Sequence, residues 1–71
     1  MYLLTQDKNK LLEFERIEVT KSFGNYWISA YGKGNASYVT AGEYKSEEEA
    51  RAEFQHIIDA LNNSQMVYEV R

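Results

Sequence analysis

Apolar and polar residues alternate along most of the chain, a pattern typical of β-strands that bury one face. The clearest case is residues 26–31, where Tyr26, Ile28 and Ala30 fall in one phase. Trp27 and Tyr31 fall in the other phase and are expected on the opposite face of that strand. The alternating segments together predict five strands, over residues 2–6, 11–20, 26–31, 37–44 and 65–70.

After Ser46 the apolar residues change from strand alternation to helical spacing, which predicts a helix over residues 47–61. Ser46 can cap the first turn with its hydroxyl, and Glu49 can reach back to the backbone amide of Ser46, completing a capping box. Three consecutive glutamates, residues 47–49, suit the positive end of the helix dipole. The apolar stripe comprises Ala50, Phe54, Ile57, Ile58 and Leu61. If Phe54 is its central core residue, Phe54→Ala should cost about 3–5 kcal/mol.

The second predicted strand contains a fault in its alternation. Leu12 and Phe14 share one phase, whereas Ile17 and Val19 share the other. One residue too many therefore lies near Glu15-Arg16, which predicts a β-bulge or a short break. Two turns are predicted further along, at residues 22–25, where Gly24-Asn25 can take positive φ, and in the hairpin loop at residues 32–35.

The order β-β-β-β-α-β predicts an α+β fold in which one helix packs on one face of an antiparallel sheet of four to five strands. Seventy-one residues allow a single domain, spanning residues 1–71. One helix covers only one face of such a sheet. The other face is therefore solvated, buried in a dimer or used for binding.

Composition excludes several classes of site. The chain has no cysteine and one histidine, which excludes disulfides, iron–sulfur clusters, thiolate zinc sites and histidine-rich metal sites. Apolar runs are too short for a transmembrane helix or a signal peptide, so we expect a cytoplasmic protein with no membrane contact. Residues 1–36 carry five basic and four acidic side chains, and residues 37–71 carry three and seven. An acidic helix half disfavours general nucleic-acid binding and suits a basic partner.

Catalysis has little support in the sequence. Glu53 can hydrogen-bond the imidazole of His56 at i, i+3 spacing, but a chain this short offers little depth for a cleft. Gly32-Lys33-Gly34 joins two strands and precedes no helix, so it lacks the context of a phosphate-binding loop. We therefore predict no enzyme, no catalytic residue, no metal site and no cofactor.

The best candidate for a binding site is a group of aromatic residues. Trp27, Tyr31 and Tyr38 are expected on or near one face of the sheet, and tryptophan and tyrosine commonly anchor protein interfaces. We predict a small interaction module or accessory protein that binds another protein through these three residues. A secondary acidic patch on the helix comprises Glu48, Glu53 and Asp59.

Two alternatives remain open for the aromatic residues. Sheet aromatics can stack the bases of a single-stranded nucleic acid, although few basic residues accompany them. In the other alternative the protein is a purely structural homodimer, and Trp27 is buried between the two copies.

The chain also resembles a group of short proteins of Gram-positive bacteria and their phages that have no established function. The resemblance is carried by Leu3-Leu4-Thr5-Gln6-Asp7, Leu12-Glu13-Phe14, Gly42-Glu43-Tyr44, Ser46-Glu47-Glu48-Glu49-Ala50 and Met66-Val67-Tyr68-Glu69-Val70. The chain differs from this group at Arg71, where similar proteins tend to end in proline. The resemblance implies a small cytoplasmic accessory protein and supplies no site residues.

Overall fold

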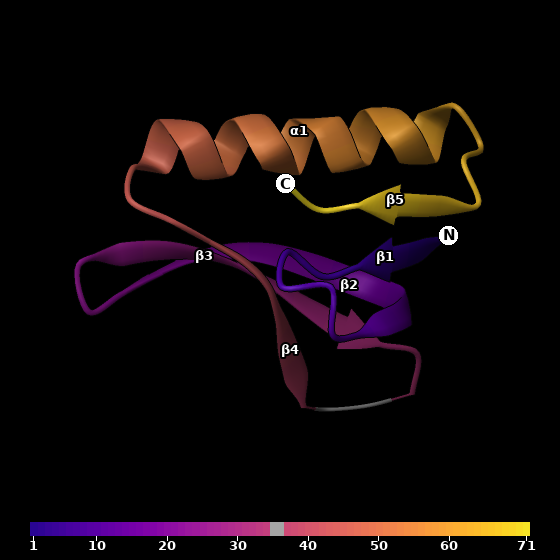
Figure 1. The fold of residues 1–71 in the computed structure, drawn as a ribbon, viewed down its shortest axis with the longest axis horizontal. Coiled ribbons are helices and arrows are strands. Elements are labelled where there is room, and N and C mark those ends of the chain that lie inside the picture. The colour runs from indigo at the N-terminus through magenta and orange to yellow at the C-terminus, as the bar shows by residue number, and fades with distance from the viewer. Residues whose placement is uncertain (35–36) are drawn as a thin grey trace.

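In the computed structural model, which describes residues 1–34 and 37–71, one helix packs on a curved five-stranded sheet (Figure 1). The elements are β1 (Tyr2–Leu4), β2 (Leu11–Ser22), β3 (Asn25–Gly32), β4 (Tyr38–Tyr44), α1 (Glu47–Asn62) and β5 (Val67–Glu69). The predicted α+β fold and the order of its elements are therefore confirmed. Asn35, which the sequence placed in a hairpin loop, lies outside the described residues.

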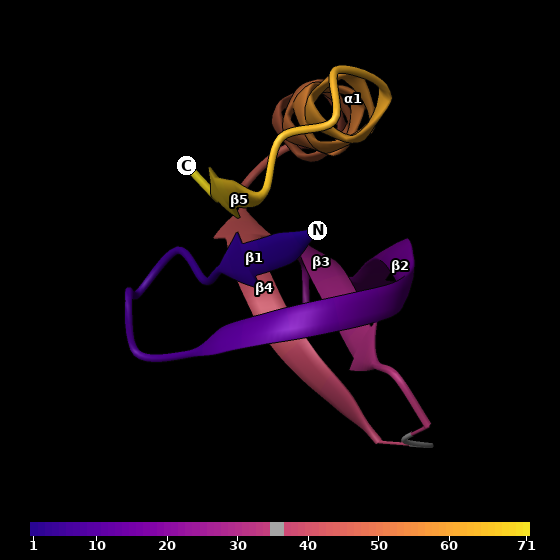
Figure 2. The same ribbon diagram turned by 90° about the vertical axis from the view of Figure 1, so that its right-hand side faces the viewer.

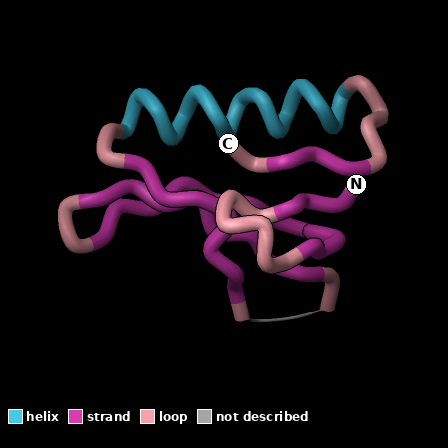
Figure 3. Tube along the Cα trace, in the orientation of Figure 1, coloured by secondary structure: helices cyan, strands magenta, loops and turns pink. Residues whose placement is uncertain are grey.

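The strands lie in the order β4-β3-β2-β1-β5. All neighbours are antiparallel except β1 and β5, which are parallel, so the sheet is mixed rather than wholly antiparallel. Figure 3 shows the reason: the chain passes along the sheet as α1, turns, and returns beneath the helix as β5. This return places β5 beside the free edge of β1, and the two strands run in the same direction.

The sheet curls strongly, as the end-on view of the helix in Figure 2 shows. Its curl carries the end of β1 to the far edge strand, β4. The backbone N–H of Gln6 donates to the carbonyl of Ala41 at 2.8 Å, and Glu43 N–H donates to the side-chain oxygen of Gln6 at 2.9 Å. Gln6 therefore covers part of the β4 edge, which would otherwise offer unpaired backbone groups.

The predicted fault in the second strand is a real irregularity of register. Phe14 lies opposite Gly32, and Arg16 lies opposite Tyr31, so Glu15 is the extra residue of a bulge. A second shift, which the sequence analysis did not predict, lies between Ile28 and Ser29, opposite Gly42 and Thr40.

The hairpin between β2 and β3 has a two-residue loop. Ser22 pairs with Asn25, and the loop residues Phe23 and Gly24 have φ of 52° and 78°. Positive φ at both positions is the signature of a type I′ turn. The prediction of positive φ at Asn25 is therefore wrong by one position, because Asn25 belongs to β3 and Phe23 takes the left-handed conformation.

The helix begins at Glu47 as predicted and ends at Asn62, one residue later than predicted, and its cap differs in one bond. Ser46 accepts a hydrogen bond from Glu49 N–H at 3.1 Å, and Asn63 is the C-cap residue. The Glu49 carboxylate accepts from the Ser46 hydroxyl at 3.1 Å, whereas the capping box had placed it on the Ser46 amide.

The core lies between α1 and the sheet, where α1 packs against β2, β3 and β4. Its largest apolar side chains with no solvent exposure are Leu3, Ile28 and Ile57. The buried stripe of α1 is rotated from the predicted one and comprises Ala50, Glu53, Ile57 and Ala60. The condition set for Phe54, that it is the central core residue, is not met, because Phe54 is only partly buried and packs against the core from its margin.

No helix of the described residues is long and apolar enough to cross a membrane.

Candidate functional site

The three predicted aromatic residues lie together on the outer face of the sheet, which is the face opposite α1. In the strand register Trp27 lies between Thr20 and Glu43, and Tyr31 lies between Arg16 and Tyr38. Because side chains alternate along a strand, this set points away from the face that buries Ile28 and Ala30.

One end of this face is a hollow of ≈ 280 Å³, here called the aromatic hollow. None of the described residues that line it carries a charged side chain. They comprise Thr20, Ser22, Phe23, Trp27, Ser29, Tyr38 and Thr40. Trp27 is half-buried, and its indole N–H donates to the carbonyl of Ser22 at 3.1 Å, which fixes the ring against the base of the β2–β3 hairpin.

Phe23 is the residue of this hollow that the sequence analysis missed. It lies at the tip of the β2–β3 hairpin, its exposed fraction is 99%, and its φ is 52°. Asparagine, aspartate or glycine normally fills the first position of a type I′ turn, because a bulky residue is strained there. The signal in the sequence was the aromatic residue directly before Gly24 in a two-residue turn.

Tyr31 is less available than Trp27 or Tyr38. The Arg16 guanidinium lies 3.9 Å from the centroid of its ring, a cation–π contact. The Tyr31 hydroxyl donates to Glu18 at 3.4 Å, and Glu18 also lies 3.5 Å from Arg16. The Tyr38 ring, at 59% exposure, lies 6.0 Å away at a tilt of 54°. One ring face of Tyr31 is therefore already covered.

A second hollow adjoins the first at the edge of β4 and shares Trp27 and Thr40 with it. We call it the acidic hollow, because its walls include Asp7 and Glu43. The remaining wall residues are Gln6, Ala41 and Gly42.

The carboxylates of the acidic hollow are both anchored. Asp7 accepts hydrogen bonds from the Thr5 hydroxyl at 2.7 Å and from the backbone N–H of Asn9 at 3.0 Å. These bonds hold the pKa of Asp7 below its usual value, because they stabilise the ionised form. The Asn25 amide donates to Glu43 at 2.6 Å.

The predicted acidic patch on the helix is only partly formed. Glu48 and Asp59 are exposed on α1, and Asp59 accepts from Gln55 at 3.0 Å. The placement of Glu53 in this patch is wrong, because Glu53 is 5% exposed and points toward β5. Hydrogen-bond donors on and after β5 make that burial tolerable, and a helical periodicity does not reveal them.

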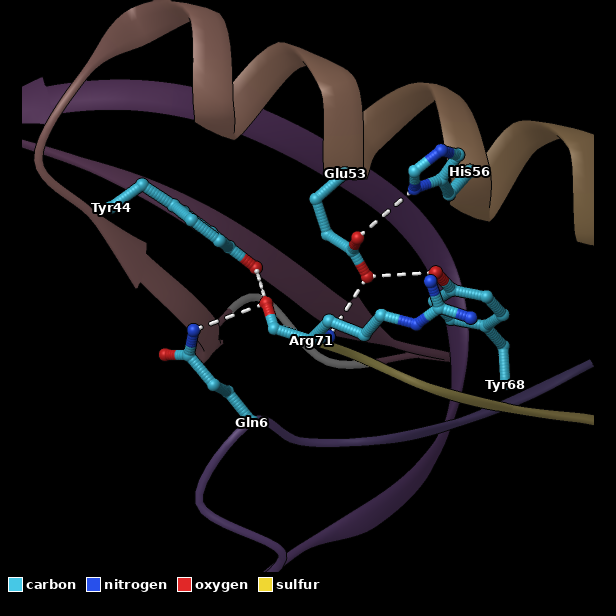
Figure 4. A network of polar contacts seen from close by, with 6 residues as sticks. All are labelled: Gln6, Tyr44, Glu53, His56, Tyr68 and Arg71. Atoms are coloured by element: carbon cyan, nitrogen blue, oxygen red, sulfur yellow. Dashed lines mark hydrogen bonds and ion pairs between the residues drawn. The ribbon is translucent and has the colours of Figure 1, made fainter.

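Glu53 forms the centre of a polar network between α1 and the end of β5 (Figure 4). One of its oxygens accepts from the Tyr68 hydroxyl at 2.8 Å and from the Arg71 backbone N–H at 2.9 Å. Its other oxygen lies 3.3 Å from Nδ1 of His56, as the i, i+3 spacing predicted. Tyr44 and the Gln6 amide donate to the Arg71 carbonyl at 2.8 and 3.2 Å.

Two tyrosine hydroxyls of this network are held as hydrogen-bond donors. Burial, followed by the hydrogen bond to Glu53, raises the pKa of Tyr68 to about 12, so its hydroxyl stays a donor at neutral pH. Burial and the negative charge of Glu53 also raise the pKa of Tyr44. Because both oxygens of Glu53 have partners within the fold, the network ties the end of β5 to α1.

Within residues 1–34 and 37–71, no three histidine or carboxylate side chains gather closely enough to hold a metal ion. Comparisons with protein-family models, with curated proteins and with solved structures found no match.

Proposed function

We propose that this protein is a small, non-enzymatic interaction module that acts inside the cell by binding another protein through the outer face of its sheet. Phe23, Trp27 and Tyr38 form the centre of the contact, and Tyr31 supports it from the side. The exposed helix residues Glu48 and Asp59 form a separate acidic surface.

Phe23 is the observation that carries this proposal. A fully exposed phenylalanine in the left-handed conformation stabilises neither the turn nor the core. Strained residues of this kind cluster at functional sites. Its position beside a half-buried tryptophan and an uncharged hollow resembles the arrangement of interface hot spots, where aromatic anchors lie next to pockets.

Binding of single-stranded nucleic acid is the weaker alternative. Base stacking needs free ring faces, and Arg16 already covers one face of Tyr31. The carboxylates of Asp7 and Glu43 adjoin the aromatic hollow and would repel phosphates.

Site-specific photo-crosslinking tests the proposal. A benzophenone amino acid replaces Phe23 in one variant and Gln55, which is exposed on α1, in the matched control. We expect protein adducts from position 23 and none of the same mass from position 55. Adducts with nucleic acid would favour the alternative, and adducts of the chain with itself would favour a homodimer. Equal adducts from both positions, or none from position 23, would contradict the proposal.

A further inference from the structure

The aromatic hollow and the acidic hollow form one continuous surface across β3 and β4, because Trp27 and Thr40 line both. One half of that surface is aromatic and uncharged, and the other half carries two carboxylates. A ligand that lies across Trp27 therefore meets two different chemical environments side by side.

From this pairing we infer that the partner binds with a peptide segment in which an apolar side chain stands close to a lysine or arginine. The apolar side chain occupies the aromatic hollow, and the cation lies against Asp7 and Glu43. This inference rests on the proposed function, since it names the chemistry of the partner that binds the same face.

The aromatic hollow selects the apolar side chain. Phe23, Trp27 and Tyr38 offer ring surface, and the other four walls are serine or threonine. A charged side chain entering this hollow would lose hydration and gain no countercharge from its walls. An aromatic or leucine side chain would remove the exposed Phe23 ring from water.

The acidic hollow selects the cation. Asp7 uses Oδ1 for its bonds to Thr5 and Asn9, and Glu43 uses Oε2 for its bond to Asn25. Among the described residues Glu43 Oε1 has no hydrogen-bond donor, whereas the Asn9 side chain also bonds to the Asp7 carboxylate. A carboxylate can accept about four hydrogen bonds, so both Asp7 and Glu43 retain the capacity to accept bonds from an ammonium or a guanidinium.

Two residues near the acidic hollow, Lys10 and Gln6, also affect how a partner can bind there. Lys10 is the cation whose charge helps to lower the pKa of Asp7, but it does not line the hollow, and none of the described wall residues is positively charged. Gln6 already covers the β4 edge at Ala41 and Glu43. A partner therefore cannot add a strand at that stretch, and recognition there depends on its side chains.

The geometry also limits the spacing in the partner. An extended chain advances roughly 3.3 Å per residue, and the two hollows share walls. We therefore expect the apolar residue and the cation to lie within roughly three residues of each other.

A selection from random short peptides displayed on phage tests the inference. The wild-type protein and the Asp7→Asn/Glu43→Gln variant are immobilised in parallel, and the selected peptides are then measured against both by calorimetry. Asparagine at position 7 keeps an oxygen that can accept the turn hydrogen bonds. Circular dichroism confirms that both proteins are folded, and Glu43→Gln alone serves if the double variant is not.

We expect the wild type to enrich peptides that pair an aromatic residue or leucine with lysine or arginine, in either order. Neutralising the carboxylates should raise the Kd of these peptides roughly twofold to tenfold, and salt should weaken binding to the wild type more than to the variant.

Peptides that bind without a basic residue, or equally well to both proteins, would overturn the inference while leaving the proposed function intact. Enrichment no greater than on a Phe23→Asn/Trp27→Ala variant would overturn both. The same samples test whether a second copy of the chain or a nucleic acid binds this surface instead. Concentration-dependent dimers in sedimentation that Phe23→Asn abolishes, or tight binding of a single-stranded oligonucleotide, would also contradict a basic peptide as the ligand.

Discussion

Glu53 connects α1 to the last strand more directly than any other residue of the polar network. Glu53 is 5% exposed, and its carboxylate accepts hydrogen bonds from the Tyr68 hydroxyl and the Arg71 amide. A buried carboxylate is costly unless donors surround it, so the stability of this contact depends on keeping all its partners in place.

Replacing Glu53 with alanine is expected to lower the free energy of unfolding by about 1–3 kcal/mol, because the Tyr68 hydroxyl and the Arg71 amide lose their acceptor. Glu53→Gln keeps one acceptor oxygen and should cost less. Glu48→Ala, on the exposed side of α1, is the matched control and should stay within about 0.5 kcal/mol of wild type. Urea titration measures all three, and equal losses in Glu53→Ala and Glu48→Ala would contradict this role.

The same network predicts a loss of stability in alkali. Burial and the bond to Glu53 raise the pKa of Tyr68 from its ordinary value of 10.0 to about 12 in the folded protein. The folded state therefore retains this proton longer than the unfolded chain. The stabilisation is complete below pH 10 and is lost as the pH rises from 10 towards 12.

Unfolding in urea at a series of alkaline pH values measures this loss. Tyr68→Phe has no proton to release and should show a shallower decline than wild type. Tyr38→Phe, which alters an exposed tyrosine, should keep the wild-type slope. A Tyr68→Phe variant with an unchanged slope would show that Tyr68 is not the titrating group.

At the scale of single residues, the sequence predicts the Glu53–His56 contact, because i, i+3 spacing on a helix is local geometry. It does not predict that Glu53 is buried. The donors that make its burial tolerable come from Tyr68 and Arg71, which are distant in sequence and are brought to Glu53 by the tertiary fold, in which β5 pairs with β1.

In α1, the ends of the helix and its buried face are specified by different signals in the sequence. Ser46 marks the beginning of the helix through a local bond to the Glu49 amide, and Asn63 marks the end. Ser46→Ala should lower the free energy of unfolding by about 0.5–2 kcal/mol, because the first turn loses its acceptor. Thermal unfolding measures this change. Ser46→Asp, which can also cap, should retain most of the stability, and an equal loss in both variants would contradict the capping role.

The buried face of α1 predicts unequal costs for its large side chains. Ile57 has no exposure, so Ile57→Ala should lower the free energy of unfolding by about 2–5 kcal/mol. Phe54 is only partly buried, so Phe54→Ala should cost less than Ile57→Ala despite the larger side chain. Urea titration of the two variants checks the order, and a greater loss in Phe54→Ala would contradict it.

Helical periodicity predicts a buried stripe but leaves its rotation to tertiary packing. Ala50 and Ala60 allow close approach to the sheet, and this rotates the stripe toward Glu53 and away from Leu61, which is 49% exposed. Strand alternation was more informative, because its period of two assigns each residue to one of two faces. It placed Trp27 and Tyr31 opposite Ile28 and predicted a bulge or break near Glu15-Arg16, where the register does shift.

For the whole molecule, the helix and the outer face of the sheet lie on opposite sides and carry different chemistry. The acidic first turn of α1 lies on one side, and the uncharged aromatic hollow lies on the other. The sequence predicts this division through Trp27, Tyr31 and Tyr38. It does not predict the acidic hollow, because Asp7 and Glu43 meet only when the curled sheet brings the end of β1 to β4.

Phe23 allows the requirements of folding to be separated from those of binding. Asparagine suits the left-handed first position of a turn before Gly24, whereas phenylalanine there is strained and fully exposed. If the aromatic side chain serves only the contact, its removal should not harm the fold.

The most direct test is therefore the free energy of unfolding of Phe23→Asn, measured by urea titration beside its affinity for the peptides that wild type selects. We predict that stability is unchanged or rises by up to about 1 kcal/mol, while peptide affinity falls at least tenfold, or about 1.4 kcal/mol. A loss of stability with peptide affinity retained would mean that Phe23 belongs to the fold, and would contradict the outer face of the sheet as the binding surface.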